Sequence, residues 1–218
     1  MLSAHERTPP LPLPPGPTLS PNLREGPFIK RSLVALGLLA ALPFAAAHAA
    51  DGISYNFVEA GYAATSTDED ADGFGLNASV AVHPNFHLFG GYSNQEIDGT
   101  SYDFDQWRIG VGYNHEISRN ADLVTRIAYE KFDAGRTAFG TRLDPDGYSV
   151  EVGLRGGMLP NLEGHALVGY EDYGSDYDDD FYGRLGAVWK FNPNWGLSGD
   201  VKFVSGDTQW FIGPRFTW

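Results

Sequence analysis

The sequence predicts an all-β protein, a transmembrane antiparallel up-and-down β-barrel of about ten strands. Three observations lead to this class: segments in which every second residue is apolar, connections that alternate between tight turns and longer polar loops, and an aromatic C-terminus. A period of two is that of a strand with one apolar and one polar face. An open sheet in lipid would leave N–H and C=O groups unpaired, so the strands must close into a ring.

The composition narrows the class of protein. The 218 residues include 27 glycines and no cysteine, and the formal net charge is −13. Without cysteine, disulfides and thiolate metal sites are excluded. An acidic chain without a clustered Lys/Arg surface argues against a nucleic-acid partner. We also expect no cofactor.

Residues 30–49 read as a secretory signal peptide. Lys30 and Arg31 precede an apolar run at 33–42, and Ala47 and Ala49 fit a small-x-small cleavage site. The run is shorter than the roughly 20 residues of a transmembrane helix, so we expect it to be removed. This predicts export to the outer membrane.

Upstream, residues 1–29 form a proline-rich extension, which we expect to be disordered. A signal peptide normally begins near its charged residues, so the translation start is predicted near Ile29 and the extension is expected not to be translated. The barrel itself is predicted to occupy residues 50–218.

Ten segments carry the strand pattern. They are 54–65, 73–83, 86–95, 104–115, 121–132, 147–158, 162–173, 180–191, 195–204 and 208–218. Their lengths are close to the roughly 9 to 11 residues with which a tilted strand crosses the hydrocarbon layer. An eight-strand barrel stays open as an alternative if the first and last segments are misassigned.

The connections should alternate between two rims. Tight turns are expected at 84–85, 118–120, 160–161 and 192–194, and longer loops at 66–72, 96–103, 133–146, 174–179 and 205–207. Outer-membrane barrels have short periplasmic turns and long external loops, so an even strand number places both ends of the barrel in the periplasm.

The C-terminal sequence WFIGPRFTW resembles the signature by which the barrel-assembly machinery recognises outer-membrane barrels. Its elements here are Gly213, Phe216 and Trp218. The segment 30–62, the Pro-Asn turns and this aromatic end resemble a xanthomonad-type family of small outer-membrane barrels once proposed as an activator of plant immunity. The likeness covers about 30–218 and departs in the proline-rich extension. It implies an envelope or vesicle role, with links to biofilm and motility, and no catalysis.

The alternation predicts charged side chains of both signs inside the ring. The candidates for lumenal ion pairs are Arg108, Arg126, Glu130, Glu151, Arg155, Arg184, Lys190, Asp200, Lys202 and Arg215, with Glu59, Glu163, His165 and Glu171 on the same face. A narrow barrel is filled by its own side chains, and buried charges must be paired. A structural ion-pair core is favoured over a narrow water-filled path.

The predicted long loops are acidic. Carboxylates occur at Asp68, Glu69, Asp70 and Asp72, and at Asp172, Asp176, Asp178, Asp179 and Asp180. Such clusters can hold divalent cations, but the sequence DEDAD lacks the glycine and distant glutamate of an EF-hand loop. Solvated loops are the favoured interpretation.

The histidines do not suggest an enzyme. His83, His87, His115 and His165 all lie near the predicted tight turns, away from the acidic outer loops. The outer loops offer carboxylates without a histidine partner, so a His-dependent hydrolase would lack its base there. His83 and His87 are too few to hold a metal and are expected in a wet turn.

Aromatic residues near the strand ends are typical of the two interfacial girdles of a membrane barrel. They include Tyr92, Trp107, Tyr113, Tyr129, Tyr148, Tyr170, Trp189, Trp195, Trp210 and Trp218. The alternative is ordinary packing in a soluble sandwich or lipocalin-like cup.

Together these patterns predict an outer-membrane barrel, not an enzyme, with a structural or surface-interaction role in the envelope, vesicles, biofilm or adhesion. The alternative function is a narrow pore for small solutes or ions. The expected partners are outer-membrane lipid, lipopolysaccharide and the barrel-assembly machinery, with divalent cations at the acidic loops.

Overall fold

The computed structural model describes residues 52–67, 70–100, 102–134, 144–174 and 179–218. Ten strands follow one another along the chain. They are β1 (Phe57–Ser66), β2 (Ala71–His83), β3 (Phe86–Ile97), β4 (Asp103–Ser118), β5 (Ala121–Asp133), β6 (Asp146–Leu159), β7 (Leu162–Asp172), β8 (Asp180–Lys190), β9 (Trp195–Val204) and β10 (Asp207–Thr217). The predicted extension and signal peptide lie outside the described residues.

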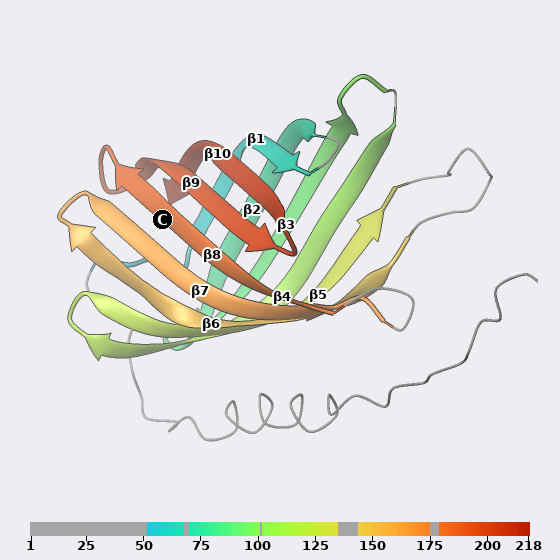
Figure 1. Cartoon of the computed structure of the whole chain (residues 1–218). Coiled ribbons are helices and arrows are strands. Elements are labelled where there is room, and N and C mark those ends of the chain that lie inside the picture. The colour runs from blue at the N-terminus through green and yellow to red at the C-terminus, as the bar shows by residue number, and fades with distance from the viewer. Residues whose placement is uncertain (1–51, 68–69, 101, 135–143, 175–178) are drawn as a thin grey trace, which may run out of the picture. The chain divides into compact units, whose positions relative to one another are not determined.

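The strands form a closed antiparallel barrel in which each strand pairs with its sequence neighbours and β1 pairs with β10 (Figure 1). The ten-strand prediction is confirmed and the eight-strand alternative is wrong. Closure gives every strand two partners, so no sheet edge is left unpaired. No helix among the described residues is long and apolar enough to cross a membrane.

The two rims of the barrel differ. One, the short-turn rim, carries the turns at 84–85, 119–120, 160–161 and 191–194, together with the C-terminus (Figure 1). The other, the long-loop rim, carries the remaining connections. One of these is shorter than predicted, because Ser205 and Gly206 join β9 to β10 directly and both have positive φ. A two-residue hairpin turn of this kind needs positive φ at both positions, which glycine adopts without strain.

The outer surface of the barrel is apolar. Along β4, Ile109 and Val111 are exposed, whereas Arg108, which precedes Ile109, is half-buried. Along β8, Leu185 and Trp189 are exposed. A soluble sandwich would bury such side chains, whereas here they face outward on successive strands. This is the surface of a membrane-spanning barrel, with lipid in place of an apolar core.

Aromatic side chains form two belts on this surface. Towards the long-loop rim, ring contacts join Phe74 to Tyr92, Trp107 to Tyr129, and Tyr148 through Tyr170 to Phe181. Towards the short-turn rim, contacts join Phe86 to Tyr113, Trp189 to Phe191, and Trp195 through Phe216 to Trp218. All ten predicted girdle aromatics are exposed or half-buried on strands or, for Trp218, just after one.

The tyrosines of the long-loop belt point their hydroxyl groups at carboxylates near that rim. Tyr92 donates to Asp105 at 2.6 Å, and Tyr170 donates to Asp179 at 2.9 Å. An aromatic ring with a polar tip fits a membrane interface, because its body is apolar and its hydroxyl is wet.

The seam between β1 and β10 depends on two glycines. A Cβ on Gly213 would lie 2.2 Å from the carbonyl oxygen of Ala60, and a Cβ on Gly61 would lie 2.1 Å from the carbonyl oxygen of Ile212. Only glycine allows the two backbones to approach so closely. Gly213 of the predicted assembly signature therefore has a packing role in the folded barrel.

The first strand starts later than predicted. β1 begins at Phe57, and residues 52–56 precede it without strand structure. Ile53 and Tyr55 alternate with polar residues as a strand would, but both are buried. We call residues 52–56 the N-terminal plug, because its side chains fill one end of the lumen.

Candidate functional site

Glu151 lies at the centre of the lumen and contacts three arginines. Its carboxylate is 3.5 Å from Arg108 Nη2, 3.6 Å from Arg126 Nη1 and 3.4 Å from Arg184 Nη1. Tyr182 donates a further hydrogen bond to it at 3.0 Å. Strands β4, β5, β6 and β8 each contribute one of the four charged residues, so the network ties opposite parts of the wall together.

Two of these arginines have a second carboxylate. Arg108 Nε is 3.3 Å from Glu130, and Arg184 Nε donates to Asp200 at 2.8 Å. Asp200 also contacts His165 Nε2 at 2.8 Å. Arg126 has no such second carboxylate among the described ion pairs.

Nearer the short-turn rim, Glu163 forms ion pairs with two cationic side chains. Arg155 Nε donates to it at 2.5 Å, and Lys190 Nζ is 3.1 Å away. Both carboxylate oxygens are used, which is what a buried charge requires.

Two further pairs complete the set. Arg215 on β10 donates to Glu59 on β1 at 2.6 Å, so an ion pair crosses the seam. Lys202 Nζ contacts Glu171 at 2.5 Å near the long-loop rim.

The structure thus places all ten predicted lumenal residues in ion pairs with one another or with other described carboxylates. They are Arg108, Arg126, Glu130, Glu151, Arg155, Arg184, Lys190, Asp200, Lys202 and Arg215. Glu59, Glu163, His165 and Glu171 pair as well. Ion pairs that cross the lumen in this way leave little continuous space inside the barrel.

The N-terminal plug closes the lumen near the short-turn rim. Ile53 and Tyr55 form an apolar cluster with Val124 and Leu167. The Tyr55 ring stacks on His87 with 4.4 Å between centroids, and its hydroxyl donates to Asp122 at 2.9 Å. Burial raises the pKa of the Tyr55 phenol, so the hydroxyl stays protonated as a donor.

Cations on the barrel wall hold the backbone of the plug. Arg155 donates to the carbonyl oxygen of Ser54 at 2.8 Å and stacks its guanidinium over the Tyr55 ring. Lys190 donates to the carbonyl oxygen of Gly52. Side-chain cations satisfy two carbonyl groups that no strand partner would reach, which fixes the plug in one position.

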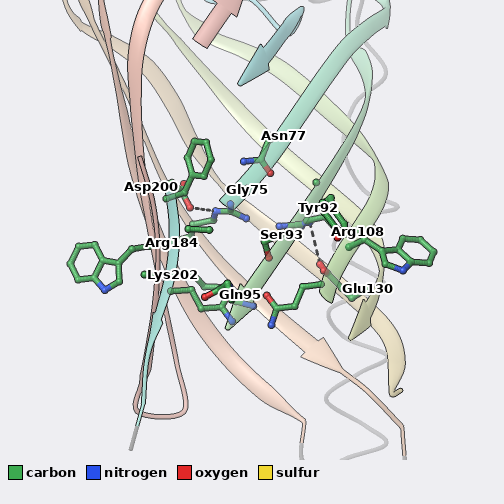
Figure 2. A pocket seen from close by; sticks show the side chains of 18 of the residues that line it. Gly75, Asn77, Tyr92, Ser93, Gln95, Arg108, Glu130, Arg184, Asp200 and Lys202 are labelled. Atoms are coloured by element: carbon green, nitrogen blue, oxygen red, sulfur yellow. Dashed lines mark hydrogen bonds and ion pairs between the residues drawn. The ribbon is translucent and has the colours of Figure 1, made fainter. Parts of the chain in front are cut away.

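The lumen is open on the long-loop side of Glu151. A cavity of about 120 Å³ lies there, and polar side chains line it, including Asn77, Ser93, Gln95 and Gln106. Figure 2 shows the Arg184–Asp200 and Arg108–Glu130 pairs on opposite sides of this pocket. Gln106 and Gln209 also line a cavity of about 290 Å³ at the rim, so the two cavities adjoin.

His87 corrects a sequence prediction. We expected His83 and His87 to share a wet turn, yet His87 is 1% exposed and lies against Tyr55 inside the barrel. His83 is exposed. The sequence pattern could have predicted this, because side chains alternate along β3 and an outward Leu88 requires His87 to point inward.

Sequence reasoning also missed Asp122 and Tyr182 in the lumen. Asp122 is fully buried and accepts from Tyr55, and Tyr182 donates to Glu151. The alternation along β5 places Asp122 on the same face as Arg126. The plug, which supplies Tyr55 as a partner of Asp122, could not be read from that pattern.

The predicted cation-binding loops are only partly described. Asp68, Glu69, Asp176 and Asp178 lie outside the described residues. Within the part of the chain that the structure describes, no group of three His, Asp or Glu side chains is placed to hold a metal ion. Divalent cations at these loops stay a prediction.

The predicted assembly signature lies at the closure of the barrel. Phe216 packs against Trp195 with 5.0 Å between centroids and against Trp218 at 6.1 Å, in the belt of the short-turn rim. Recognition by the assembly machinery stays a prediction.

Comparison with known proteins gave similarities of structure. No protein-family model matches the chain, and no match was found among curated proteins. Among solved structures, the KdgM porin is 15% identical over 74% of this chain and 99% of its own, with a TM-score of 0.42. Neisserial surface protein A is 17% identical over 76% and 98%, with a TM-score of 0.36. Outer membrane phospholipase A from Escherichia coli is 12% identical over 75% and 97%, with a TM-score of 0.39. At these identities the likeness concerns the barrel fold.

Proposed function

We propose that this chain is a small outer-membrane barrel with a closed lumen, acting as a structural or surface-interacting protein of the envelope. The observation that carries the proposal is the combination of a lipid-facing exterior with a lumen blocked by ion pairs and by the N-terminal plug. The short-turn rim then lies in the periplasm with both ends of the barrel, and the long-loop rim faces outward.

The exterior supports the membrane part of the proposal. Ile109 lies mid-way along β4 and is 60% exposed, whereas Ile117 is near the end of the same strand at the short-turn rim. An Ile109→Arg substitution should lower the free energy of unfolding in lipid vesicles by about 2–4 kcal/mol, and Ile117→Arg by only about 0–1 kcal/mol. Equal effects at both depths would contradict a span through the bilayer.

The lumen supports a closed barrel. A pore needs a continuous water path, but Glu151 with its three arginines crosses the middle and Tyr55 fills one end. Two of these arginines, Arg108 and Arg184, line the cavity on the long-loop side. The narrow-pore alternative requires both obstructions to move.

Planar-bilayer recording of the refolded full chain separates the two functions. We expect no stepwise conductance under an applied voltage. A variant lacking residues 52–56 loses only one of the two obstructions, so we expect it to stay closed as well, because the ion pairs of Glu151 still cross the lumen. Regular conductance steps from the unmodified chain would overturn the closed-barrel proposal and favour the pore.

The surface role in this proposal rests on the outer surface and the long-loop rim. The outward aromatic belts and the acidic residues of the long-loop rim fit contact with outer-membrane lipid and, through divalent cations, with lipopolysaccharide. Membership of the xanthomonad-type family, a role in vesicles, biofilm or adhesion, and the absence of catalysis belong to the same proposal. Loss of lipopolysaccharide binding on chelation of divalent cations would support it, and binding that is unaffected by a chelator would count against it.

A further inference from the structure

A second, smaller cavity lies in the middle of the lumen, between the plug and the cavity of Figure 2. Its volume is about 50 Å³. A polar cavity of roughly 10–15 Å³ already holds one water molecule, so there is room here for a small ion with one or two waters. All ten strands contribute residues to its walls.

The lining of this cavity is strongly cationic. Five arginines line it, namely Arg108, Arg126, Arg155, Arg184 and Arg215, against two carboxylates, Glu59 and Asp200. Both carboxylates are already occupied, Glu59 by Arg215 and Asn77, and Asp200 by Arg184 and His165. Neither is free to neutralise a further cation.

Several donors at the cavity have no acceptor among the described residues. Arg155 is 3% exposed and uses Nε and Nη2, but its Nη1 has no hydrogen-bond partner. The Nε of Arg126 and the hydroxyl of Ser79 are also without partners, and Ser79 is 4% exposed. A buried donor left unsatisfied is costly, so these groups require an acceptor.

We propose that the cavity is a binding site for a small inorganic anion of the halide class, held by Arg126, Arg155 and Ser79. An anion accepts from every donor around it, whereas a water must also donate, for which the lining offers a ring nitrogen of His87 and the hydroxyl of Ser79. Glu130, Glu151 and Glu163 pair with Arg108, Arg126 and Arg155 but do not line the cavity. The guanidinium groups are therefore the nearest charges to an occupant, which favours an anion over water. Arg126 shares its one carboxylate, Glu151, with two other arginines, and its Nε keeps a free N–H that can donate to an anion.

The walls restrict the size of the anion. The rings of Phe57 and Phe89 line the same cavity and stack against Arg215 and Arg126. These apolar rings leave room for chloride or bromide but not for a large organic anion such as gluconate. The site is independent of whether the barrel conducts.

Bromide is the probe for the test. Crystals of the full chain grown in sodium bromide should show an anomalous peak in this cavity within hydrogen-bond reach of Arg126 and Arg155. The apparent melting temperature in detergent should be higher in sodium chloride or bromide than in sodium gluconate of the same ionic strength, by about 4 °C if the anion is well above its dissociation constant.

Variants then tie the effect to the site. Arg126→Gln should abolish the difference between chloride and gluconate, and Ser79→Ala, which keeps every charge, should reduce it. The matched control is Arg119→Gln in the exposed β4–β5 turn, which should leave the difference unchanged. An empty or water-filled cavity in the bromide crystals, or a halide effect that persists in both site variants, would overturn the proposal.

Discussion

The two ends of the lumen are closed to different degrees. At the short-turn end, Ile53 and Tyr55 of the plug pack against Val124 and Leu167, and cations hold the plug backbone. At the long-loop end, amide and hydroxyl side chains line open cavities of about 120 and 290 Å³. The comparison shows that ion pairs alone leave space inside a ten-strand ring, and that an apolar segment is needed to seal it. Among the described residues, the lumen is therefore sealed at the short-turn end and open towards the long-loop rim.

The largest expected difference between the two ends is in the loss of stability when a tyrosine is replaced by alanine. Tyr55→Ala removes a buried ring from the plug and should lower the free energy of unfolding by about 3–5 kcal/mol. Tyr102→Ala at the long-loop rim, where the side chain is 51% exposed, should stay within about 0.5 kcal/mol. Urea titrations in detergent, monitored by tryptophan fluorescence, measure both. Similar losses for the two variants would mean that the plug does not stabilise the barrel.

Cysteine labelling tests access directly, because the chain has no cysteine of its own. Ser93→Cys in the open cavity should react with a charged thiol reagent about 100-fold faster than Ser198→Cys, which is buried on the plug side. Deleting residues 52–56 should raise the rate at Ser198→Cys and leave the rate at Ser93→Cys unchanged. Equal rates in the full chain would remove the distinction between the ends.

A subtler change separates the packing of the plug from its hydrogen bond. Tyr55→Phe keeps the ring but leaves the fully buried Asp122 without this donor, which should lower the free energy of unfolding by about 1–3 kcal/mol. Thermal unfolding in detergent at neutral pH provides the measurement. Replacing Asp122 by Asn in the Tyr55→Phe background should recover part of the loss, since a neutral amide costs less to bury than a carboxylate that has lost this donor. If the double variant is as unstable as Tyr55→Phe, charge burial is not the cause.

The smallest effect is expected at Gln95. Its side chain is 3% exposed, but its Oε1 has no hydrogen-bond partner among the described residues. Gln95→Leu removes an unsatisfied polar group at similar volume and should change the free energy of unfolding by less than about 1 kcal/mol, in either direction. A loss of several kcal/mol in a urea titration would indicate that the open end is as tightly organised as the plugged end.

Much of the site could be predicted because alternation along a strand is a strict rule. Once Ile109 and Leu185 are placed outward, Arg108 and Arg184 must point inward, and the structure places them there. The same rule applied to β3 would have found His87. Strand ends were predicted less well, since β4 continues to Ser118 and β1 starts at Phe57. Local sequence does not limit how far pairing with a neighbouring strand continues.

The sequence by itself determined the closed ring and which side chains face lipid or lumen, because strands have a period of two and every backbone group in a membrane must be paired. The structure fixed the strand number at ten. Only the tertiary structure decided which charges pair across the lumen, that Glu151 serves three arginines, and that residues 52–56 turn inward. These depend on distances between strands far apart in the chain. No local pattern records which of several opposite charges a side chain meets inside a closed barrel.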